Sequence, residues 1–228
     1  MDVHCGTIGL RPSLVCDSKP PTILHTLKLD AALGTTRTAR VWFGDLPEAQ
    51  YPAEAVLSRT VLSRVGTSPL AGKRVVVELV RPNCGPSTYA LLGGSFAPNE
   101  TQELKIEAAV AGSPGPSAPW AMPLYPNFTN VWLSRQFADA VIEAAAAEVP
   151  SLALGGGVLR FDRAVKDQVG SSQWMFKIVA RLVMHLMVIN NSHDDDQLAE
   201  IFRKLIHSTS IGTVGNYLES SQAEKPAP

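Results

Sequence analysis

The sequence is poor in cysteine and nearly neutral in charge. Its three cysteines, Cys5, Cys16 and Cys84, are widely spaced, with no CxxC pair and no histidine at zinc-finger spacing. We therefore expect reduced thiols, no metal site and no cofactor. The net charge of −1 lacks the basic excess of a dedicated nucleic-acid binder. We expect no DNA partner, and any RNA contact would have to be local.

Segments that direct a protein into a membrane are also missing. The N-terminus has Asp2 and no basic region before a continuous apolar run, which argues against a secretory signal. The longest apolar stretch, residues 174–189, is shorter than the ~20 residues that cross a bilayer and contains three polar side chains. We expect a cytoplasmic protein without a membrane partner.

The motifs of common catalytic sites are absent as well. No GxxxxGK(S/T) sequence occurs, so the chain contains no P-loop GTPase. The serines that could act as nucleophiles, Ser87, Ser95 and Ser171, lack a GxSxG setting. The glycines 155–157 precede a predicted strand instead of opening a helix, so they favour a turn over a phosphate site. No catalytic residue is predicted, although an enzyme of unknown class is one alternative.

The most apolar stretch, residues 171–190, predicts a buried helix around which the rest of the chain packs. From Trp174 to Ile189 the only polar residues are Lys177, Arg181 and His185, which recur at i, i+4 and i+8 and form one narrow stripe. The stripe is either the least buried edge of a core helix or a surface that contacts an acidic partner. Ser171 or Ser172 should cap this helix.

The remaining elements follow from the hydrophobic period. Further helices are expected at residues 53–65, 135–148 and 197–207, and strands at 22–33, 37–43, 73–80, 87–96, 104–110 and 158–165. The Gly93–Gly94 pair inside a strand predicts a bulge. Strands 87–96 and 104–110 should pair as a hairpin. We predict an α+β fold with a mixed or antiparallel sheet and helices packed on one face.

Five segments are expected along the chain. They are an extended N-terminal segment (1–21), an α/β subdomain (22–86), a second subdomain (87–190), an amphipathic helix (191–209) and a disordered tail (210–228). Residues 111–126 are rich in proline and form the best internal linker, although their aromatic residues indicate that they lie on the body. The acids Asp194, Asp195 and Asp196 beside His193 are interpreted as helix caps and not as metal ligands.

Two short segments resemble a known family. Val169–Gly170–Ser171–Ser172 followed by Phe176–Lys177 is one, and Leu133–Ser134–Arg135–Gln136–Phe137 leading to Ala140–Val141 is the other. On these residues and the order of elements, the stretch Thr88 to Ile189 resembles domain IV of translation elongation factor G. The resemblance implies a β–α–β–α unit whose loop tips reach the decoding region of the ribosome.

The resemblance also points to candidate binding residues in two loops, which we expect to form one tip. They are Asn99 and Glu100 in one loop, and Arg163, Lys166 and Asp167 in the other. Asp167 stands where the family has a histidine, and the acids at the tip would repel phosphate. We therefore predict a non-catalytic binding or assembly protein on a translation-factor-like scaffold, with a protein partner or self-association in a larger complex. The alternative is a ribosome- or RNA-associated factor without a GTPase domain.

Overall fold

The structure is a computed structural model that describes residues 23–29, 37–63, 73–81, 88–122, 128–189 and 194–207. The predicted segment 1–21, the predicted tail 210–228, the three cysteines and His193 lie outside the described residues. Among the helices of the described residues, none is long and apolar enough to cross a membrane.

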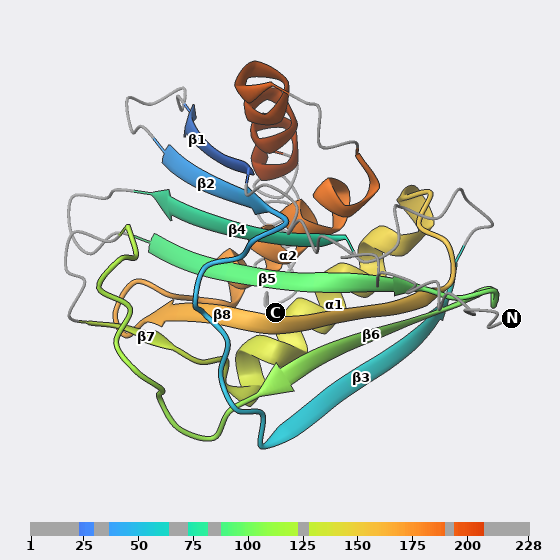
Figure 1. Ribbon diagram of the computed structural model, residues 1–228, viewed down its shortest axis with the longest axis horizontal. Coiled ribbons are helices and arrows are strands. Elements are labelled where there is room, and N and C mark those ends of the chain that lie inside the picture. The colour runs from blue at the N-terminus through green and yellow to red at the C-terminus, as the bar shows by residue number, and fades with distance from the viewer. Residues whose placement is uncertain are drawn as a thin grey trace, which may run out of the picture.

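Eight strands form one mixed sheet within the described residues (Figure 1). Its path runs through β1 (Ile23–Leu29), β2 (Arg37–Phe43), β4 (Arg74–Arg81), β5 (Thr88–Pro98), β8 (Gly157–Asp167), β6 (Glu103–Val110) and β3 (Ala55–Leu62). The short β7 (Thr129–Val131) pairs with β8 off this path. β6 and β8 run parallel, and the other pairs are antiparallel. Strands from residues 22–86 and 87–190 thus share a single sheet.

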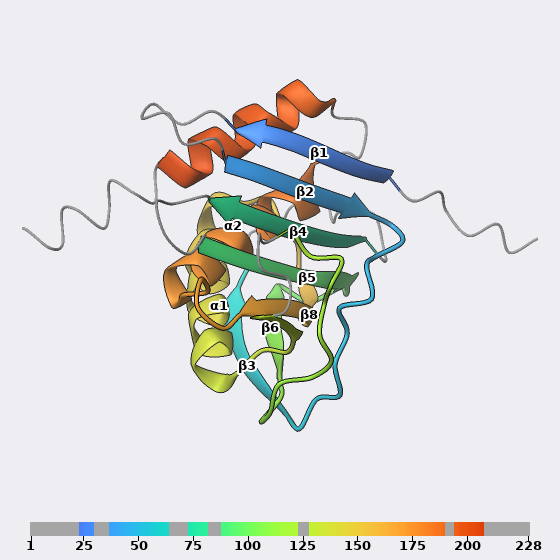
Figure 2. The same cartoon turned by 90° about the vertical axis from the view of Figure 1, so that its left-hand side faces the viewer.

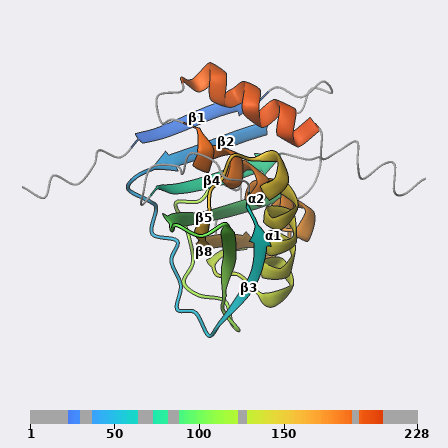
Figure 3. The same ribbon diagram turned by 90° about the vertical axis from the view of Figure 1, so that its right-hand side faces the viewer.

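Helices cover one face of the sheet. α1 (Arg135–Glu148), followed by the short 3-10 helix η2 (Val149–Ser151), and α2 (Gln173–Val188) lie on the same side of the sheet in Figures 2 and 3. A further helix, residues 195–207, lies along β1. We call this side the helix face. The opposite side is the loop face, because segments 44–54 and 111–122 cross it. The predicted α+β fold with helices on one face is confirmed.

α2 is the buried helix that the sequence predicts. Ten of its residues are buried, and Phe176 and Leu182 have no exposed surface. The Phe176 ring lies 5.0 Å from that of Phe137 on α1. The N-terminus of α2 is capped by Ser172, whose hydroxyl oxygen accepts a hydrogen bond from the Met175 N–H. At ~1.5–3 kcal/mol for each large side chain, this burial is a major part of the stability of the fold.

The helix predicted at residues 53–65 is wrong, because Ala55–Leu62 is strand β3. Leu57 and Val61 are four residues apart, a spacing that fits one face of a helix and also one face of a strand. In the structure these two side chains pack against the core, while Val56 and Leu62 point away from it and stay exposed. An edge strand needs only a few apolar residues on one face, so the hydrophobic period of residues 53–65 did not distinguish a helix from a strand.

The predicted hairpin of strands 87–96 and 104–110 is also wrong. β8 lies between β5 and β6 and pairs with both of them. Leu159, Phe161 and Ala164 on β8 are fully buried, and so are Leu104, Ile106 and Ala108 on β6, so burial does not distinguish the two strands. What differs is the connection: α1 lies between β6 and β8 in the chain, and a helical crossover of this kind joins neighbouring parallel strands. Closeness in sequence favoured the β5–β6 hairpin, but β8 inserts between these two strands.

The predicted bulge at Gly93–Gly94 is confirmed by a register shift between β5 and β8 at this pair. Added Cβ atoms at these glycines would lie 2.3 Å from Val76 Cγ2 and 2.3 Å from the Arg160 carbonyl oxygen. The shift leaves Asp162 as the extra residue of β8. Beside the bulge, the Ala164 N–H donates to the Ala49 carbonyl oxygen at 3.1 Å, which fastens segment 44–54 to the loop face.

Candidate functional site

The stripe of Lys177, Arg181 and His185 lies against α1. Lys177 Nζ is 2.7 Å from a carboxylate oxygen of Glu143. Arg181 and His185 both contact the carboxylate of Glu148, the latter at 2.9 Å. The hydrogen bond from His185, followed by that from Arg181, lowers the pKa of Glu148 against the effect of burial. The stripe is therefore the polar edge of the α1–α2 interface, and a contact with an acidic partner stays a prediction.

The two predicted tip loops lie at opposite ends of the sheet. Pro98 at the end of β5 is paired with Gly157 at the start of β8, so Asn99 and Glu100 are near that start. Asp167 is at the other end of β8, where it pairs with Thr129 of β7. The expectation of one joint tip is therefore wrong, because it rested on a β5–β6 hairpin with β8 outside it.

Two of the predicted tip residues, Asn99 and Asp167, accept hydrogen bonds within the fold. Asn99 Oδ1 accepts hydrogen bonds from the backbone N–H and the hydroxyl of Thr101, whereas Glu100 is exposed. Asp167 is buried, and its carboxylate accepts from the N–H groups of Val169 and Gly170, both at 2.8 Å. This carboxylate therefore closes the turn after β8, and a binding role for Asp167 stays a prediction.

The two basic residues of the predicted tip also have partners. Arg163 pairs with Asp162 at 2.7 Å. Lys166 Nζ lies 4.8 Å from the ring centre of Trp132 and 4.7 Å from that of Phe137, and burial lowers its pKa. A phosphate contact would have to compete with these interactions, so the RNA alternative gains no support from them.

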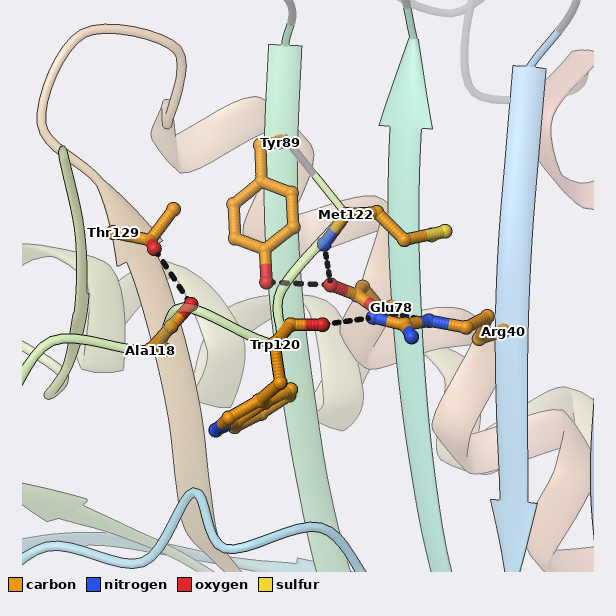
Figure 4. A network of polar contacts seen from close by, with 7 residues as sticks. All are labelled: Arg40, Glu78, Tyr89, Ala118, Trp120, Met122 and Thr129. Atoms are coloured by element: carbon orange, nitrogen blue, oxygen red, sulfur yellow. Dashed lines mark hydrogen bonds and ion pairs between the residues drawn. The ribbon is translucent and has the colours of Figure 1, made fainter. Parts of the chain in front are cut away.

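A buried polar cluster, which the sequence prediction missed, lies on the loop face (Figure 4). Its centre is Glu78 on β4, which has no exposed surface. One carboxylate oxygen accepts from the Tyr89 hydroxyl at 2.9 Å and from the Met122 N–H at 2.8 Å. The other accepts from Arg40 Nε at 2.6 Å, and Arg40 Nη2 donates to the Trp120 carbonyl oxygen at 3.0 Å. The one signal in the sequence was a single glutamate within the apolar run VVVELV.

The pKa shifts and hydrogen bonds of this cluster fit a structural role. Burial raises the pKa of Glu78, while the Met122 N–H, Arg40 and Tyr89 act in the opposite direction. Burial next to Glu78 also raises the pKa of the Tyr89 hydroxyl. Both carboxylate oxygens of Glu78 already accept hydrogen bonds from the chain. The cluster therefore holds segment 111–122 on β4 and β5. Thr129 adds to this, as its hydroxyl donates to the Ala118 carbonyl oxygen at 3.0 Å.

Metal ligation has no candidate in the described part of the chain, where no three His, Cys, Asp or Glu side chains gather closely enough to hold an ion. Of the three acids beside His193, Asp194 caps the helix as predicted. Asp194 Oδ1 accepts from the Gln197 N–H at 2.8 Å, which caps the helix of residues 195–207. Asp195 Oδ1 lies 2.6 Å from His25 Nδ1 on β1, and this contact ties the helix to the sheet.

Among the strands of the described residues, β3 has the largest share of exposed residues. Six of its eight residues are exposed, and the exposed fractions of Val56 and Leu62 are 45% and 79%. Among the described residues, β3 pairs only with β6. At the opposite edge, by contrast, β1 is flanked by the helix of residues 195–207 (Figures 2 and 3). Covering an edge with a helix is a common protection against strand pairing, and β3 lacks it within the described residues.

The backbone groups that β3 presents at this edge follow from its register with β6. The Ser63 N–H donates to the Gln102 carbonyl oxygen at 2.9 Å, one step beyond the Leu62–Glu103 pair. Antiparallel strands alternate between residues that exchange both hydrogen bonds and residues that exchange none. The N–H and C=O groups of the odd-numbered residues therefore point to β6. Those of Val56, Ser58, Thr60 and Leu62 point outward from the sheet.

Comparison with protein-family models, curated proteins and solved structures found no match for the chain. The resemblance to domain IV of elongation factor G therefore stays a prediction.

Proposed function

We propose that this protein is a non-catalytic binding or assembly protein that binds an extended segment of another protein as an added strand beside β3. The observation that carries the proposal is the open β3 edge, with outward N–H and C=O groups on alternate residues and exposed apolar side chains at Val56 and Leu62. Strand addition uses such groups for affinity and the alternating side chains for specificity. The elements β6, α1, β8 and α2 follow in this order, with the short β7 and η2 between them, and this supports a translation-factor-like β–α–β–α scaffold for this edge.

The composition of β3 supports binding at this edge. Exposed edges of natural sheets usually carry several charges, a proline or a bulge that prevents pairing. β3 reads AVLSRTVL, has one charge and no proline, and keeps a continuous register with β6. An edge of this kind is open to pairing with a segment from another chain.

The experiment that tests this proposal removes one outward N–H. Peptides that bind the wild-type protein would be selected from a displayed library of random 12-residue sequences. Thr60→Pro should abolish their binding, because proline lacks the N–H that an added strand needs, and an exposed edge tolerates it. Thr60→Val keeps the N–H and the side-chain shape and should keep binding. Thermal unfolding and circular dichroism would show that both variants fold.

Two results would contradict the proposal. One is that folded Thr60→Pro retains the selected peptides as well as Thr60→Val does. The other is that the library gives no peptide whose binding depends on residue 60.

A further inference from the structure

We infer that the β3 edge selects a partner strand with an acidic residue between two apolar residues, at positions i−2, i and i+2, on the side that faces the helices. This inference rests on the proposed function and specifies its partner. Arg59 carries the argument, because it is the one charged residue of β3. Its side chain is exposed, and it forms no ion pair or hydrogen bond with any described residue.

The neighbours of Arg59 define the rest of the pattern. Leu57 and Val61, two residues away on either side, point to the same face as Arg59. Both are half-buried and pack against the core, and α1 contacts β3 on this face. A strand added beside β3 would place one residue opposite each of these three. Apolar residues opposite Leu57 and Val61 would extend the core, and a carboxylate opposite Arg59 would complete an ion pair across the two strands.

The loop face of β3 sets a weaker preference. Val56 and Leu62 lie near the two ends of this face, and Ser58 and Thr60 lie between them. Apolar residues opposite the ends and hydroxyl residues opposite the middle would match this surface. The chemistry that β3 recognises is therefore an alternating strand with a single central carboxylate.

A second copy of β3 is a poor occupant of the same edge. Its eight residues contain no aspartate or glutamate, so self-pairing offers Arg59 no carboxylate from the added strand. The antiparallel register centred on Arg59 would also place the two guanidinium groups directly opposite each other, which destabilises a strand pair. Charge therefore favours a different protein over self-association.

The test is a charge exchange between the protein and a synthetic peptide. The peptide Ile-Val-Thr-Glu-Thr-Val-Ile, with Gly-Ser-Gly at both ends, is palindromic and fits the edge in either direction. Its matched partner has Lys in place of Glu. Wild type should bind the Glu peptide about tenfold more tightly than the Lys peptide, since a pair across strands changes from attractive to repulsive. Arg59→Glu should reverse this preference, and Arg59→Gln should remove it. Fluorescence anisotropy at low salt measures all six affinities.

The outcomes separate this inference from the function on which it rests. Equal affinity for both peptides, lost in Thr60→Pro, would overturn the acidic preference and leave strand addition in place. The same preference in wild type and Arg59→Glu would also overturn it. Tighter binding of a peptide with the β3 sequence, together with concentration-dependent dimers in solution, would assign the edge to a second copy. No binding of any peptide would contradict both the inference and the proposed function.

Discussion

The Glu78 cluster gives a stability prediction whose size follows from the structure. Glu78→Gln keeps a carbonyl oxygen that can accept from Tyr89 and Met122, and it removes the charge that faces Arg40. Breaking a buried ion pair by removing one partner costs ~3–5 kcal/mol. Because 22% of the Arg40 side chain is exposed, water replaces part of the lost interaction, and we expect a loss of ~3 kcal/mol.

A double-mutant cycle separates the ion pair from the rest of the cluster. Arg40→Met alone should cost ~3–5 kcal/mol, because it leaves the fully buried Glu78 charge without its partner. With both substitutions neither charge remains. The double variant should therefore lose less than the sum of the two single losses, by ~2 kcal/mol. Urea unfolding followed by circular dichroism measures the four stabilities, and Arg74→Met at the exposed start of β4 is the matched control.

Two further readouts test the physical reasoning. Burial raises the pKa of Glu78 and Arg40 acts against this, so Arg40→Met should raise this pKa further. The buried carboxylate of the variant then takes up a proton more readily, and the stability deficit of Arg40→Met should shrink as the pH falls. Hydrogen exchange of the Ala118 and Met122 amides should accelerate in both single variants, since the cluster holds segment 111–122 on the sheet. Losses that add within ~0.5 kcal/mol, or unchanged exchange of these amides, would refute this account.

Three other predictions concern residues on or beside the helices. Phe176→Ala and Leu182→Ala should each lower the free energy of unfolding by ~2–5 kcal/mol in urea titrations, and losses under ~1 kcal/mol would place α2 outside the core. Asp194→Ala should cost ~1 kcal/mol through the lost cap, while Asp194→Asn should cost less, and abolished zinc binding in the alanine variant would overturn the capping interpretation. The lowered pKa of Glu148 means that its pairs stabilise the fold above its ordinary pKa of 4.5 and lose this effect as the pH falls further. Glu148→Gln should therefore flatten the acid side of the stability–pH profile, and an unchanged profile would show that these pairs do not affect stability.

The sequence predicted those elements whose pattern has one structural meaning. α1 matches its expected bounds, because Phe137, Val141 and Ala145 fit a helix period. α2 and its polar stripe follow in the same way from the i, i+4, i+8 spacing of Lys177, Arg181 and His185. The prediction for β3 was wrong because a four-residue spacing is common to helix and strand periods. The β5–β6 hairpin was wrong because β8, which comes later in the chain than α1, inserts between these two strands.

The candidate sites were harder to predict than the elements. Glu78 could be recognised as unusual within its strand, but its partners Arg40, Tyr89 and Met122 come from β2, β5 and segment 111–122. Only the register of the sheet brings them together. The β3 edge was missed for a related reason, since an open edge is a property of the strand order and not of the strand itself.

The route of segment 44–54 has a consequence for the order of folding. This segment connects β2, in one half of the sheet, to β3 at the far edge. In the chain, β3 comes well before its partner β6 and before β8, the strand beside β6. Pairs between strands so distant in sequence form late, because the loop that joins them must close first. During synthesis both edges of β3 therefore stay unpaired until β6 has been made. This interval makes it the strand most open to capture by a chaperone, or by another chain, before the sheet is complete.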